Sequence, residues 1–581
     1  MRARAAGDAA LLLEAEGRAG ALAAAIRAER LPGVLDAIAG ARSVLVITEP
    51  GSWALDALAG RVAAVAGTGP DPGGQELIEI PVRYDGPALA EVASLTGLTA
   101  GEVIARHAAS EYTVGWLGFS PGFPYLTGLD PALEVPRLAA PRLRVPGGSV
   151  AIAGGLAAIY PSESPGGWRL LGRTSVPLWD AGRMPPALLA PGMRVRFRPV
   201  SELPVAPTGT PDPAGAHEQA SEPGRPGAHG WAGASGISGA HGMPVRGGSH
   251  DPEGFASPST PNPSGSWQAP AVIEVVRPGP LATVQDLGRP GLGHLGVPRS
   301  GAADAASLRR ANQLAGNPPG AAGLEFTLGR AVLRFSRDAL AAVAGAAAPV
   351  TLATGPDQAA IAVEPGVAFG VPAGALLRIG VPAAGLRTYL AVRGGIDVPA
   401  VLGSRSADLL SRLGPAPLRA GDLLPLGAAR PADPTGPGSA GIAGPGGTGI
   451  PAPGTAPQPG RAMTAPVELR VLPGPRDDWF VAGAIEVLCS ARYVVTPASD
   501  RTGLRLDGPA LARASDSAGE LASEGMVTGA LQVPPDGQPI LLLADHPVTG
   551  GYPVIAVVRS ADTGLAAQLR PGQPVRFTLS R

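Results

Sequence analysis

The sequence predicts a mainly β protein with an α+β N-terminal part and two barrel-like units joined by a disordered linker. The chain has 581 residues, which is too long for one hydrophobic core, so several domains are expected. Over most of its length short apolar runs alternate with Pro/Gly turns, a pattern typical of small barrels or sandwiches. One long stretch instead consists of Pro, Gly, Ser, Ala and His, and it cannot bury enough apolar surface to offset its ordering entropy.

The first half divides into two parts. Residues 1–80 read as a small α+β domain, with strands at Ala9–Leu13 and Val44–Thr48 around an alanine-rich helix, Ala21–Arg30, which Pro32-Gly33 stops. Residues 81–202 read as a barrel preceded by two segments with helical spacing. The predicted segments around and within this barrel are the strand Ile78–Val82, the helices Leu89–Leu95 and Thr99–Ala108, and strands from Tyr112 to Val195–Phe197.

Residues 203–270 are the predicted linker, and residues 271–581 form the second half with a loose insertion at 430–466. The linker histidines lie about ten residues apart, a spacing that chance explains better than metal binding: His217, His229, His241 and His250. In the second half the clearest helix is Ala303–Ala315, with Asp304 as its N-cap and Gly316 after its end. The remaining predicted elements are short strands: Ala331–Phe335, Leu340–Val343, Leu376–Ile379, Thr388–Val392, Val467–Leu472, Tyr493–Thr496, Ile540–Ala544 and Val554–Val558.

The charged residues exclude several kinds of chemistry. The chain contains no lysine, so all 46 basic residues are arginine. A phosphate-binding P-loop lysine, a Schiff-base lysine, a biotin-carrying lysine and a Ser–Ser–Lys amidase triad are therefore impossible. A net charge of −1 gives no electrostatic footprint for nucleic acid, and the single cysteine, Cys489, can form neither an intrachain disulfide nor a cysteine cluster for metal. With no apolar run long enough to span a membrane, we expect a cytoplasmic protein.

Residues Gly291–Gly296 match the dinucleotide-binding pattern G-x-G-x-x-G. That motif needs a helix to begin directly after it, and Val297-Pro298 forbids one, so the dinucleotide interpretation fails. His294 lies in this loop and His546 lies at a strand end, where functional side chains gather, whereas His107 has the spacing of a packing residue.

Several loops are denser in Gly and Pro than turns alone require: Leu117–Tyr125, Val145–Ser149, Ser162–Trp168 and Gln532–Gln538. Glycine there permits close backbone approach to a ligand, although ordinary turn chemistry is the competing explanation. Aromatic residues are only 4% of the chain, so the gathering of Phe119, Phe123, Tyr125 and Trp168 beside these loops predicts a ligand pocket or an interface.

These motifs resemble a known pair of families. Tyr112–Leu129, Arg144–Gly154 and Tyr160–Thr174 resemble the family once named allophanate hydrolase subunit 1 and now associated with the B subunit of 5-oxoprolinase. The second half resembles allophanate hydrolase subunit 2, or the C subunit of 5-oxoprolinase, over Val284–Gly301, Asn312–Leu328, Arg393–Asp397, Gly403–Leu410 and Ser523–Val558. The resemblance, which extends to the carboxyltransferase domains of urea amidolyase, implies a cyclophilin-like β-barrel in both halves.

The resemblance also implies a function. The chain would be the B/C component of an ATP-dependent 5-oxoprolinase, opening 5-oxo-L-proline to L-glutamate together with a separate A subunit of the LamB/YcsF-like family. ATP, with Mg²⁺, would phosphorylate the lactam oxygen, so that catalysis rests on positioning and on stabilising phosphoryl and oxyanion charge. We expect a small-molecule substrate and no covalent biotin on this chain. We expect no nucleic-acid or membrane partner, and a homo-oligomer stays open.

The expected catalytic residues are Asp286, His294, Glu524, Asp545 and His546, with Asp304 as a further carboxylate that could serve as a base or bind Mg²⁺. Which residues hold a metal stays open. Because lysine is absent, arginine must contact phosphate, and the expected substrate- or nucleotide-binding residues are Phe119, Gly122, Phe123, Tyr125, Gly147, Gly148, Ser164, Gly166, Gly167, Arg169, Arg289, Ser300, Arg393, Arg405, Arg505, Gln532 and Tyr552.

Two other functions remain open from sequence. One is a biotin-dependent carboxyltransferase of the urea carboxylase kind, which would need a separate carrier protein. The other is a non-enzymatic binder of the kinase-inhibitor type. Release of glutamate from 5-oxoproline and ATP separates the three.

Overall fold

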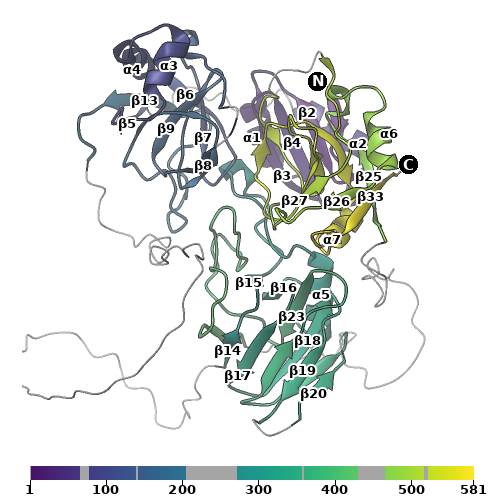
Figure 1. The fold of residues 1–581 in the computed structure, drawn as a ribbon. Coiled ribbons are helices and arrows are strands. Elements are labelled where there is room, and N and C mark those ends of the chain that lie inside the picture. The colour runs from purple at the N-terminus through teal and green to yellow at the C-terminus, as the bar shows by residue number, and fades with distance from the viewer. Residues whose placement is uncertain are drawn as a thin grey trace, which may run out of the picture. The chain divides into compact units, whose positions relative to one another are not determined.

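The protein is mainly β, as the sequence predicts, and its strands fall into four groups along the chain (Figure 1). The structure is a computed structural model that describes residues 2–65, 77–138, 140, 142–204, 271–355, 359–364, 366–428, 465–515 and 521–580. The predicted linker at 203–270 and the predicted loose insertion at 430–466 lie almost wholly outside these residues. The parts 1–205 and 270–581 form one compact unit.

The first group is an α+β domain with an antiparallel sheet in the order β1-β2-β4-β3. Its elements are β1 (Ala3–Ala5), β2 (Ala10–Glu14), α1 (Ala19–Glu29), β3 (Val34–Ala39), β4 (Ser43–Thr48) and α2 (Leu55–Val65). β2 and β4 are buried on both faces, because α1 and α2 cover one face and an apolar cluster that includes Val548 covers the other, which explains their continuous apolar sequence.

The second group is a seven-stranded sheet in the order β12-β9-β10-β7-β6-β13-β5, flanked by two helices. Its elements are β5 (Leu77–Val82), α3 (Leu89–Thr96), α4 (Ala100–Ala109), β6 (Tyr112–Leu117), β7 (Pro124–Thr127), β8 (Arg142–Val145), β9 (Ser149–Ala153), β10 (Leu156–Ile159), β11 (Ser164–Gly166), β12 (Arg169–Arg173) and β13 (Arg194–Pro199). A bridge between Arg83 and Arg173 brings the two ends of the sheet together, so we call this group the first barrel. β8 and β11 form a separate two-stranded ribbon on it.

The third group is a β-sandwich of a six-stranded and a five-stranded sheet that share one apolar core. Its elements are β14 (Val272–Arg277), β15 (Leu281–Gln285), α5 (Ala305–Ala315), β16 (Gly323–Thr327), β17 (Ala331–Phe335), β18 (Ala339–Gly345), β19 (Val350–Ala353), β20 (Ile361–Val363), β21 (Ala368–Val371), β22 (Leu376–Ile379), β23 (Arg387–Val392) and β24 (Leu423–Pro425). The predicted helix is confirmed, although it begins at Ala305 and not at Ala303. Its cap and its end are as predicted: the Asp304 side chain accepts a hydrogen bond from Ser307 N, and Gly316 ends the helix at φ 74°.

The fourth group is a closed barrel, called the second barrel here, in the order β25-β32-β29-β30-β27-β26-β33. Its elements are β25 (Val467–Pro473), α6 (Ala484–Ser490), β26 (Tyr493–Val495), β27 (Gly503–Asp507), β28 (Glu524–Gly525), β29 (Ala530–Gln532), β30 (Ile540–Leu542), β31 (Thr549–Gly550), β32 (Val554–Val558), α7 (Thr563–Ala566) and β33 (Pro574–Leu579). β28 and β31 form a ribbon like that of β8 and β11.

The two barrels repeat one design. In each, the first strand runs parallel to the last (β5 with β13, β25 with β33), and the remaining strands follow in the same order. Details repeat as well: Tyr112 packs on Phe197 with ring centroids 5.1 Å apart, and at the same register Tyr493 packs on Phe577 at 6.1 Å. The prediction of two barrel-like units is therefore confirmed.

The α+β domain contacts the second barrel rather than only the first (Figure 1). Ala41 N donates to Ser523 O at 2.8 Å, and strand β28 lies against β3 and β4. Val548 is buried in an apolar cluster with Leu12 and Leu45 of the α+β domain. The two halves that the sequence separates by a long linker thus share an extensive contact.

His107 is a packing residue, as predicted. It is fully buried, stacks on Phe197 at 4.7 Å and hydrogen-bonds Tyr84 through Nδ1 at 2.8 Å. Burial lowers the pKa of His107 to about 3, so the imidazole is neutral. No helix in the described parts of the chain is long and apolar enough to cross a membrane.

Candidate functional site

A cavity of about 480 Å³ lies where the α+β domain, the Gly-rich loop before α5 and the second barrel meet. We call it the junction cavity. Its polar lining residues include Asp36, Thr48 and Glu49 from the first of these three parts, Arg289, Arg299 and Ser300 from the second, and Thr528, His546 and Ser560 from the third, and Arg309 of α5 also lines it. Both halves of the chain are therefore needed to build its walls.

Asp36 joins the two halves at one wall of the cavity. It lies inside the apolar strand β3, and its carboxylate accepts hydrogen bonds from its neighbour Ala37 N at 2.8 Å and from Gly293 N, in the Gly-rich loop of the other half, at 2.7 Å. Burial raises the pKa of Asp36, and these two hydrogen bonds and nearby Arg27 counter the rise only in part. The Gly-rich loop holds no nucleotide-binding helix but one 3-10 turn, Gly293–Leu295, which Pro298 prevents from continuing.

Ser300 connects the cavity wall to a buried ion-pair network. Its hydroxyl donates to Asp545 Oδ1 at 2.7 Å, and its backbone lies in the left-handed region at φ 52°. Arg501 binds the same Asp545 through Nε at 2.9 Å and through Nη2 at 3.0 Å. A strained residue held by a buried carboxylate is the kind of feature found at functional sites.

Arg501 also crosses from the second barrel to the sandwich. It pairs with Glu325 on β16 and donates to Gly301 O at 2.6 Å. Burial opposes the charge of Arg501, but Asp545 and Glu325 outweigh it and raise the pKa of Arg501. Burial likewise opposes ionisation of Glu325, yet Arg501 and Arg387 hold its pKa below the usual range. Arg501 and Glu325 are thus a charged pair in the interior.

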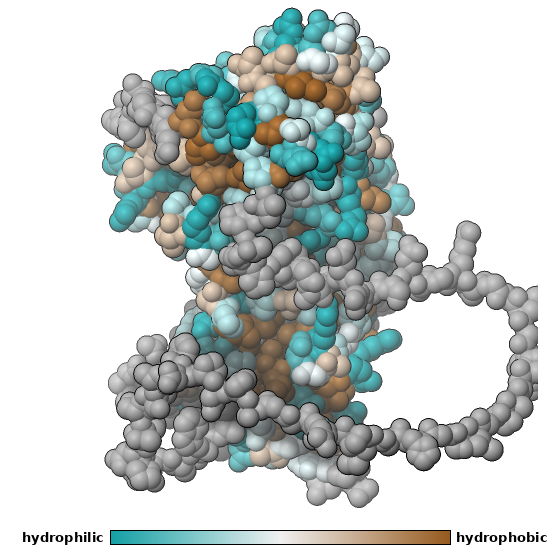
Figure 2. All heavy atoms as spheres, turned by 90° about the vertical axis from the view of Figure 1, so that its left-hand side faces the viewer, coloured by the Kyte–Doolittle hydropathy of each residue, from teal (hydrophilic) through white to brown (hydrophobic). Residues whose placement is uncertain are grey.

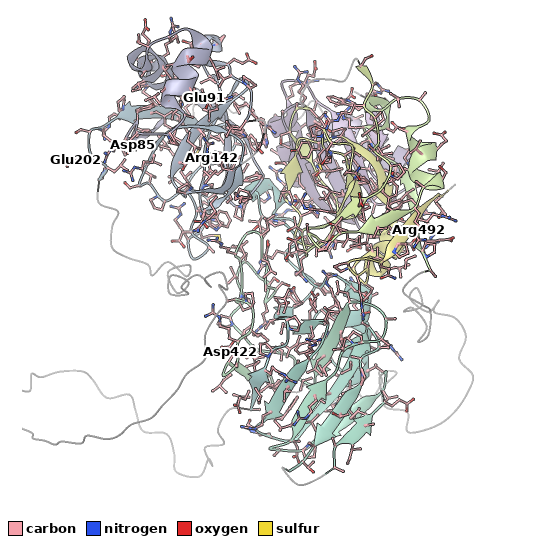
Figure 3. The ribbon with its side chains drawn as sticks, in the orientation of Figure 1. Asp85, Glu91, Arg142, Glu202, Asp422 and Arg492 are labelled. Atoms are coloured by element: carbon pink, nitrogen blue, oxygen red, sulfur yellow. The ribbon has the colours of Figure 1, made fainter. Side chains whose placement is uncertain are left out.

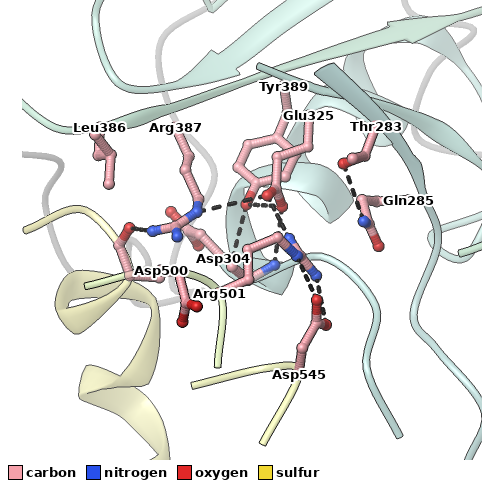
Figure 4. A network of polar contacts seen from close by, with 12 residues as sticks. Thr283, Gln285, Asp304, Glu325, Leu386, Arg387, Tyr389, Asp500, Arg501 and Asp545 are labelled. Carbon is pink, nitrogen blue, oxygen red and sulfur yellow. Dashed lines mark hydrogen bonds and ion pairs between the residues drawn. The ribbon is translucent and has the colours of Figure 1, made fainter. Parts of the chain in front are cut away.

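A second layer holds this network in place (Figure 4). Tyr389 donates to Glu325 Oε2 at 2.8 Å, and Ala303 N donates to the same oxygen at 3.0 Å. Asp304, besides capping α5, accepts from Gln568 Nε2 at 2.9 Å. The Asp304 carboxylate therefore caps the start of α5 and binds Gln568 of the second barrel.

Asp286 fastens the Gly-rich loop to the loop after β23. Its carboxylate accepts hydrogen bonds from Gly288 N at 2.8 Å, Ser404 Oγ at 2.6 Å and Arg405 N at 2.7 Å, and from Ser406 Oγ. With its lone pairs used in this way, Asp286 serves to shape the loop and is a poor base.

Arg289 lies beside this loop, only 2% exposed. Its Nε donates to Val401 O at 3.0 Å and its Nη2 to Ser406 O at 2.5 Å, while Nη1 is buried without a partner. One Asp408 carboxylate oxygen is also buried without a partner. Burial raises the pKa of Asp408 to about 7, with the charge of Asp545 adding to the rise. These neighbouring unsatisfied groups mark the loops around Arg289 as polar space that a ligand or water can use.

The two predicted histidines stand in different places. His546 lines the cavity, and its Nδ1 lies 2.9 Å from Pro547 O. His294 lies in the Gly-rich loop with Nδ1 3.1 Å from Gly291 O. A carbonyl only accepts, so both Nδ1 atoms carry the proton and both Nε2 atoms are acceptors. Burial lowers the pKa of His546, and burial with Arg27 lowers that of His294 to about 4, so both rings are neutral at pH 7.

The predicted phosphate-binding arginines do not converge. Arg169 pairs with Glu91 on the first barrel, Arg405 pairs with Asp397 at 2.6 Å, and Arg393 lies just after β23. Arg505 lines a smaller cavity of about 300 Å³ on the second barrel. Of the five, only Arg289 reaches the junction cavity, whose exposed cations are instead Arg299 and Arg309.

The aromatic residues predicted to form a ligand pocket or an interface lie at an interface between the first barrel and the second. Phe119 N donates to Thr549 Oγ1 at 2.9 Å, and the Tyr125 hydroxyl lies 3.4 Å from the same oxygen. Gly122 N donates to Leu295 O at 2.8 Å. Phe123 packs edge-on against Tyr125 with ring centroids 5.0 Å apart. These residues therefore connect the halves outside the cavity.

The remaining predicted residues lie away from the cavity. Glu524 is paired with Arg476, which also reaches Glu14 of the α+β domain at 3.4 Å. Gln532 is buried, and Tyr552 is partly exposed. The glycines and the serine of the first barrel lie in and beside its turns and ribbon: Gly147, Gly148, Ser164, Gly166 and Gly167.

The predicted Mg²⁺ carboxylates Asp286, Asp304, Glu524 and Asp545 do not gather, and no group of three or more potential ligands for a metal ion occurs among the described residues. Sequence reasoning missed Asp36, Glu325, Arg387 and Arg501. Three of these four lie in strands that are otherwise apolar (β3, β16, β23), and a charge inside a buried strand is the signal that could have identified them.

Two protein families match the chain. The family described as "Carboxyltransferase domain, subdomain C and D" matches residues 1–189, and "Carboxyltransferase domain, subdomain A and B" matches residues 295–579. The C subunit of 5-oxoprolinase from Escherichia coli K12 is 35% identical over 309 residues, 53% of this chain and 90% of that protein. The B subunit of 5-oxoprolinase from Escherichia coli O157:H7 is 45% identical over 176 residues, 30% of this chain and 81% of that protein.

One solved structure resembles the whole chain. The crystal structure of TTHA0988 superposes with a TM-score of 0.74 at 36% identity, covering 98% of this chain and 99% of that one. The order of the two halves along one polypeptide is therefore shared with a protein of known structure.

Proposed function

This chain belongs to the carboxyltransferase-domain family that includes the B and C subunits of 5-oxoprolinase, and from that premise we propose that it is the fused B/C component of an ATP-dependent 5-oxoprolinase. In this proposal it acts with a separate A subunit to hydrolyse 5-oxo-L-proline to L-glutamate. The chain is similar to both subunits in one polypeptide, so the fusion would fix their one-to-one ratio.

The junction cavity carries the proposal. In the relatives the B and C parts are named as separate subunits, and here residues of both parts line the same cavity. Concave sites with a few convergent polar groups are where small ligands bind. A site built from both parts would explain why both are needed for one activity.

The proposed chemistry begins with transfer of the γ-phosphoryl group of ATP to the lactam oxygen, which breaks its bond to ADP. Water then adds to the ring carbon, the C–N bond breaks to release the amine, and a second water hydrolyses the acyl phosphate to glutamate and phosphate. Arg299 and Arg309 would bind the phosphate or the substrate carboxylate, and the Nε2 of His546 would accept a proton from the attacking water.

ATP and Mg²⁺ fit the cavity residues in different ways. The two arginines suit phosphate oxygens, whereas the part of the chain that the structure describes offers no carboxylate cluster for Mg²⁺. Mg²⁺ bound mainly through substrate phosphates is the usual arrangement for nucleotide-dependent enzymes. The metal would therefore arrive with ATP.

The test is release of glutamate from 5-oxoproline and ATP by the full chain with and without purified A subunit. The proposal predicts glutamate, ADP and phosphate in equal amounts when both proteins are present. The matched control is Arg405→Ala, which should keep full activity because the Arg405 side chain pairs with Asp397 and does not line the cavity, whereas Arg309→Ala should lose about tenfold or more. Absence of glutamate with every pairing would refute the proposal.

A second function is favoured by the family description, which names carboxyltransferase domains in both matches. Because the chain has no lysine, carboxybiotin would have to come from a separate carrier. Transfer of labelled carboxylate from free carboxybiotin to urea, without glutamate release from 5-oxoproline, would favour this function over the first.

A further inference from the structure

The repeated barrels allow their surroundings to be compared position by position. The motif Gly166-Gly167-Trp168 of the first barrel corresponds to Gly550-Gly551-Tyr552 of the second, because each follows its ribbon and leads into the equivalent strand, β12 or β32. Both next strands carry a bulge against their partner at the same place. The ribbons β8–β11 and β28–β31 are therefore equivalent parts of the two barrels.

The ribbon of the second barrel is covered. A Cβ added at Gly525 would come within 2.6 Å of the Leu45 side chain on β4 of the α+β domain, so only glycine fits there. Next to it, Ser523 O accepts from Ala41 N at 2.8 Å and Val548 is buried among apolar residues of that domain. This ribbon is thus a docking surface for a β-sheet.

The ribbon of the first barrel is shaped differently at that point. Val145 pairs with Ser164 and Arg142 with Gly166, which leaves two residues, Leu143 and Arg144, opposite Pro165. In the other ribbon one residue, Gly525, stands opposite Thr549. The extra residue makes a β-bulge, a device that turns a side chain outward.

Leu143 is the most exposed large apolar residue in the described parts of the chain, at 90%. Figure 2 shows the side of the molecule on which the first barrel lies, where brown apolar surface lies between hydrophilic residues. Single exposed leucines are common and need no explanation by themselves. This one, however, stands at the position where the duplicate barrel binds another domain.

The charged side chains around Leu143 are mainly arginines. Arg142 and Arg144 flank it, and Arg412 lies near through its ion pair with Glu163 at 2.9 Å. Glu163 also pairs with Arg144 at 2.6 Å, so two arginines share this carboxylate, while Arg142 donates to Trp168 O at 2.9 Å. Figure 3 shows Arg142 on the first barrel. An apolar side chain among cations fits a protein surface with an apolar recess and acidic residues at its rim.

We propose that the ribbon β8–β11, with Leu143 at its bulge, is the docking surface for the separate A subunit, contacted as the α+β domain contacts β28–β31. The proposal rests on the proposed function, which requires that partner. Leu143 projects from the surface and offers no concavity, so its occupant is a polypeptide and not a small ligand.

The experiment measures binding of purified A subunit to the immobilised full chain, with Leu143→Ser as the variant and Leu423→Ser as the control. Leu423 is also a strand leucine, 63% exposed, but on β24 of the sandwich. The dissociation constant should rise about tenfold or more for Leu143→Ser and stay unchanged for Leu423→Ser, because exposed anchors carry binding energy and not folding energy. Glutamate release by Leu143→Ser should return to the wild-type rate at saturating A subunit, which a folding defect would not allow.

Three results would overturn the proposal, and they differ in whether they also refute the proposed function. Equal affinity of the wild type and Leu143→Ser, with glutamate formed, would refute the surface and leave the proposed function intact. No binding of A subunit to the wild type would refute both. A wild-type oligomer that dissociates in Leu143→Ser would show that the ribbon contacts a second copy of this chain instead.

Discussion

Replacing Arg501 by leucine tests the ion-pair network that holds the second barrel to the sandwich. The change removes two hydrogen bonds to Asp545, the ion pair with Glu325 and the bond to Gly301 O, and leaves two carboxylates buried. Removing one partner of a buried ion pair costs about 3–5 kcal/mol. In the variant, Glu325 still has its ion pair with Arg387, 3.5 Å away, and Asp545 still accepts a hydrogen bond from Ser300. We therefore expect the free energy of unfolding to fall by an amount within that range, although two carboxylates lose a partner.

Differential scanning calorimetry of the full chain measures the effect. At about 2–4 °C per kcal/mol for a unit of this size, the transition of the second half should fall by roughly 10 °C. The control is Arg405→Leu, which breaks an ion pair that is 40% and 53% exposed at its two side chains and should cost less than about 1 kcal/mol. Equal shifts for the two variants would refute the reasoning.

The pH dependence gives an independent check. The pKa of Glu325 is lowered in the folded protein, so its stabilising contribution is present above its ordinary value of 4.5 and is lost as the pH falls through the lowered folded value. The difference in unfolding temperature between the wild type and Arg501→Leu should therefore narrow at acid pH. A constant difference between pH 7 and pH 4 would contradict this assignment of charge.

Three further predictions concern the cavity and the contact between the halves. The wild type should lose stability as the pH falls from about 6.5 toward 4, because the pKa of His294 is lowered to about 4 in the folded protein and its protonation then favours the unfolded chain. His294→Asn should make this loss smaller. Thermal melts of both proteins at about pH 4.5 and 7.5 check this. Asp36→Ala should lower the free energy of unfolding by about 1–3 kcal/mol, because two hydrogen bonds are lost. It should lower the rate of glutamate release more than it lowers the affinity for the A subunit. A turnover rate equal to that of the wild type would contradict a role of Asp36 in the cavity. Gly525→Ala should displace Leu45 and increase hydrogen exchange in β4, whereas Gly155→Ala, into open space, should not.

Most of the strands can be predicted because their sequences carry the physical cause of the fold. In the run Val467–Leu472 apolar residues alternate with charged ones before a Pro-Gly turn, and β25 occupies Val467–Pro473. Helix α2 is not predicted from the sequence. Its buried residues Leu58, Val62 and Val65 have helical spacing, but the alanine and glycine between them make the pattern hard to recognise. Helix α6 shows in the sequence only as an apolar run, and its Cys489 proves half-buried and free.

The site is less predictable because it depends on contacts between distant segments. Ser300 and His546 can be identified from their loops, but their shared cavity arises only when the α+β domain docks on the second barrel. The predicted role of Asp286 changes for the same reason. In the sequence it is an acid beside a Gly-rich loop, whereas in the structure its carboxylate accepts four hydrogen bonds. Arg501 has no local motif, and its importance comes from two partners, Asp545 and Glu325, on different domains.

The most direct test of the central claim is hydrogen exchange of the full chain with the proposed A subunit, with and without 5-oxoproline and a non-hydrolysable ATP analogue. If the junction cavity is where the reaction takes place, ligand should protect amides on both of its sides, in 35–50 of the first half and in 289–300 and 544–548 of the second. Protection of only one half, or protection confined to the turns of the first barrel at Gly147 and Gly148, would contradict the account.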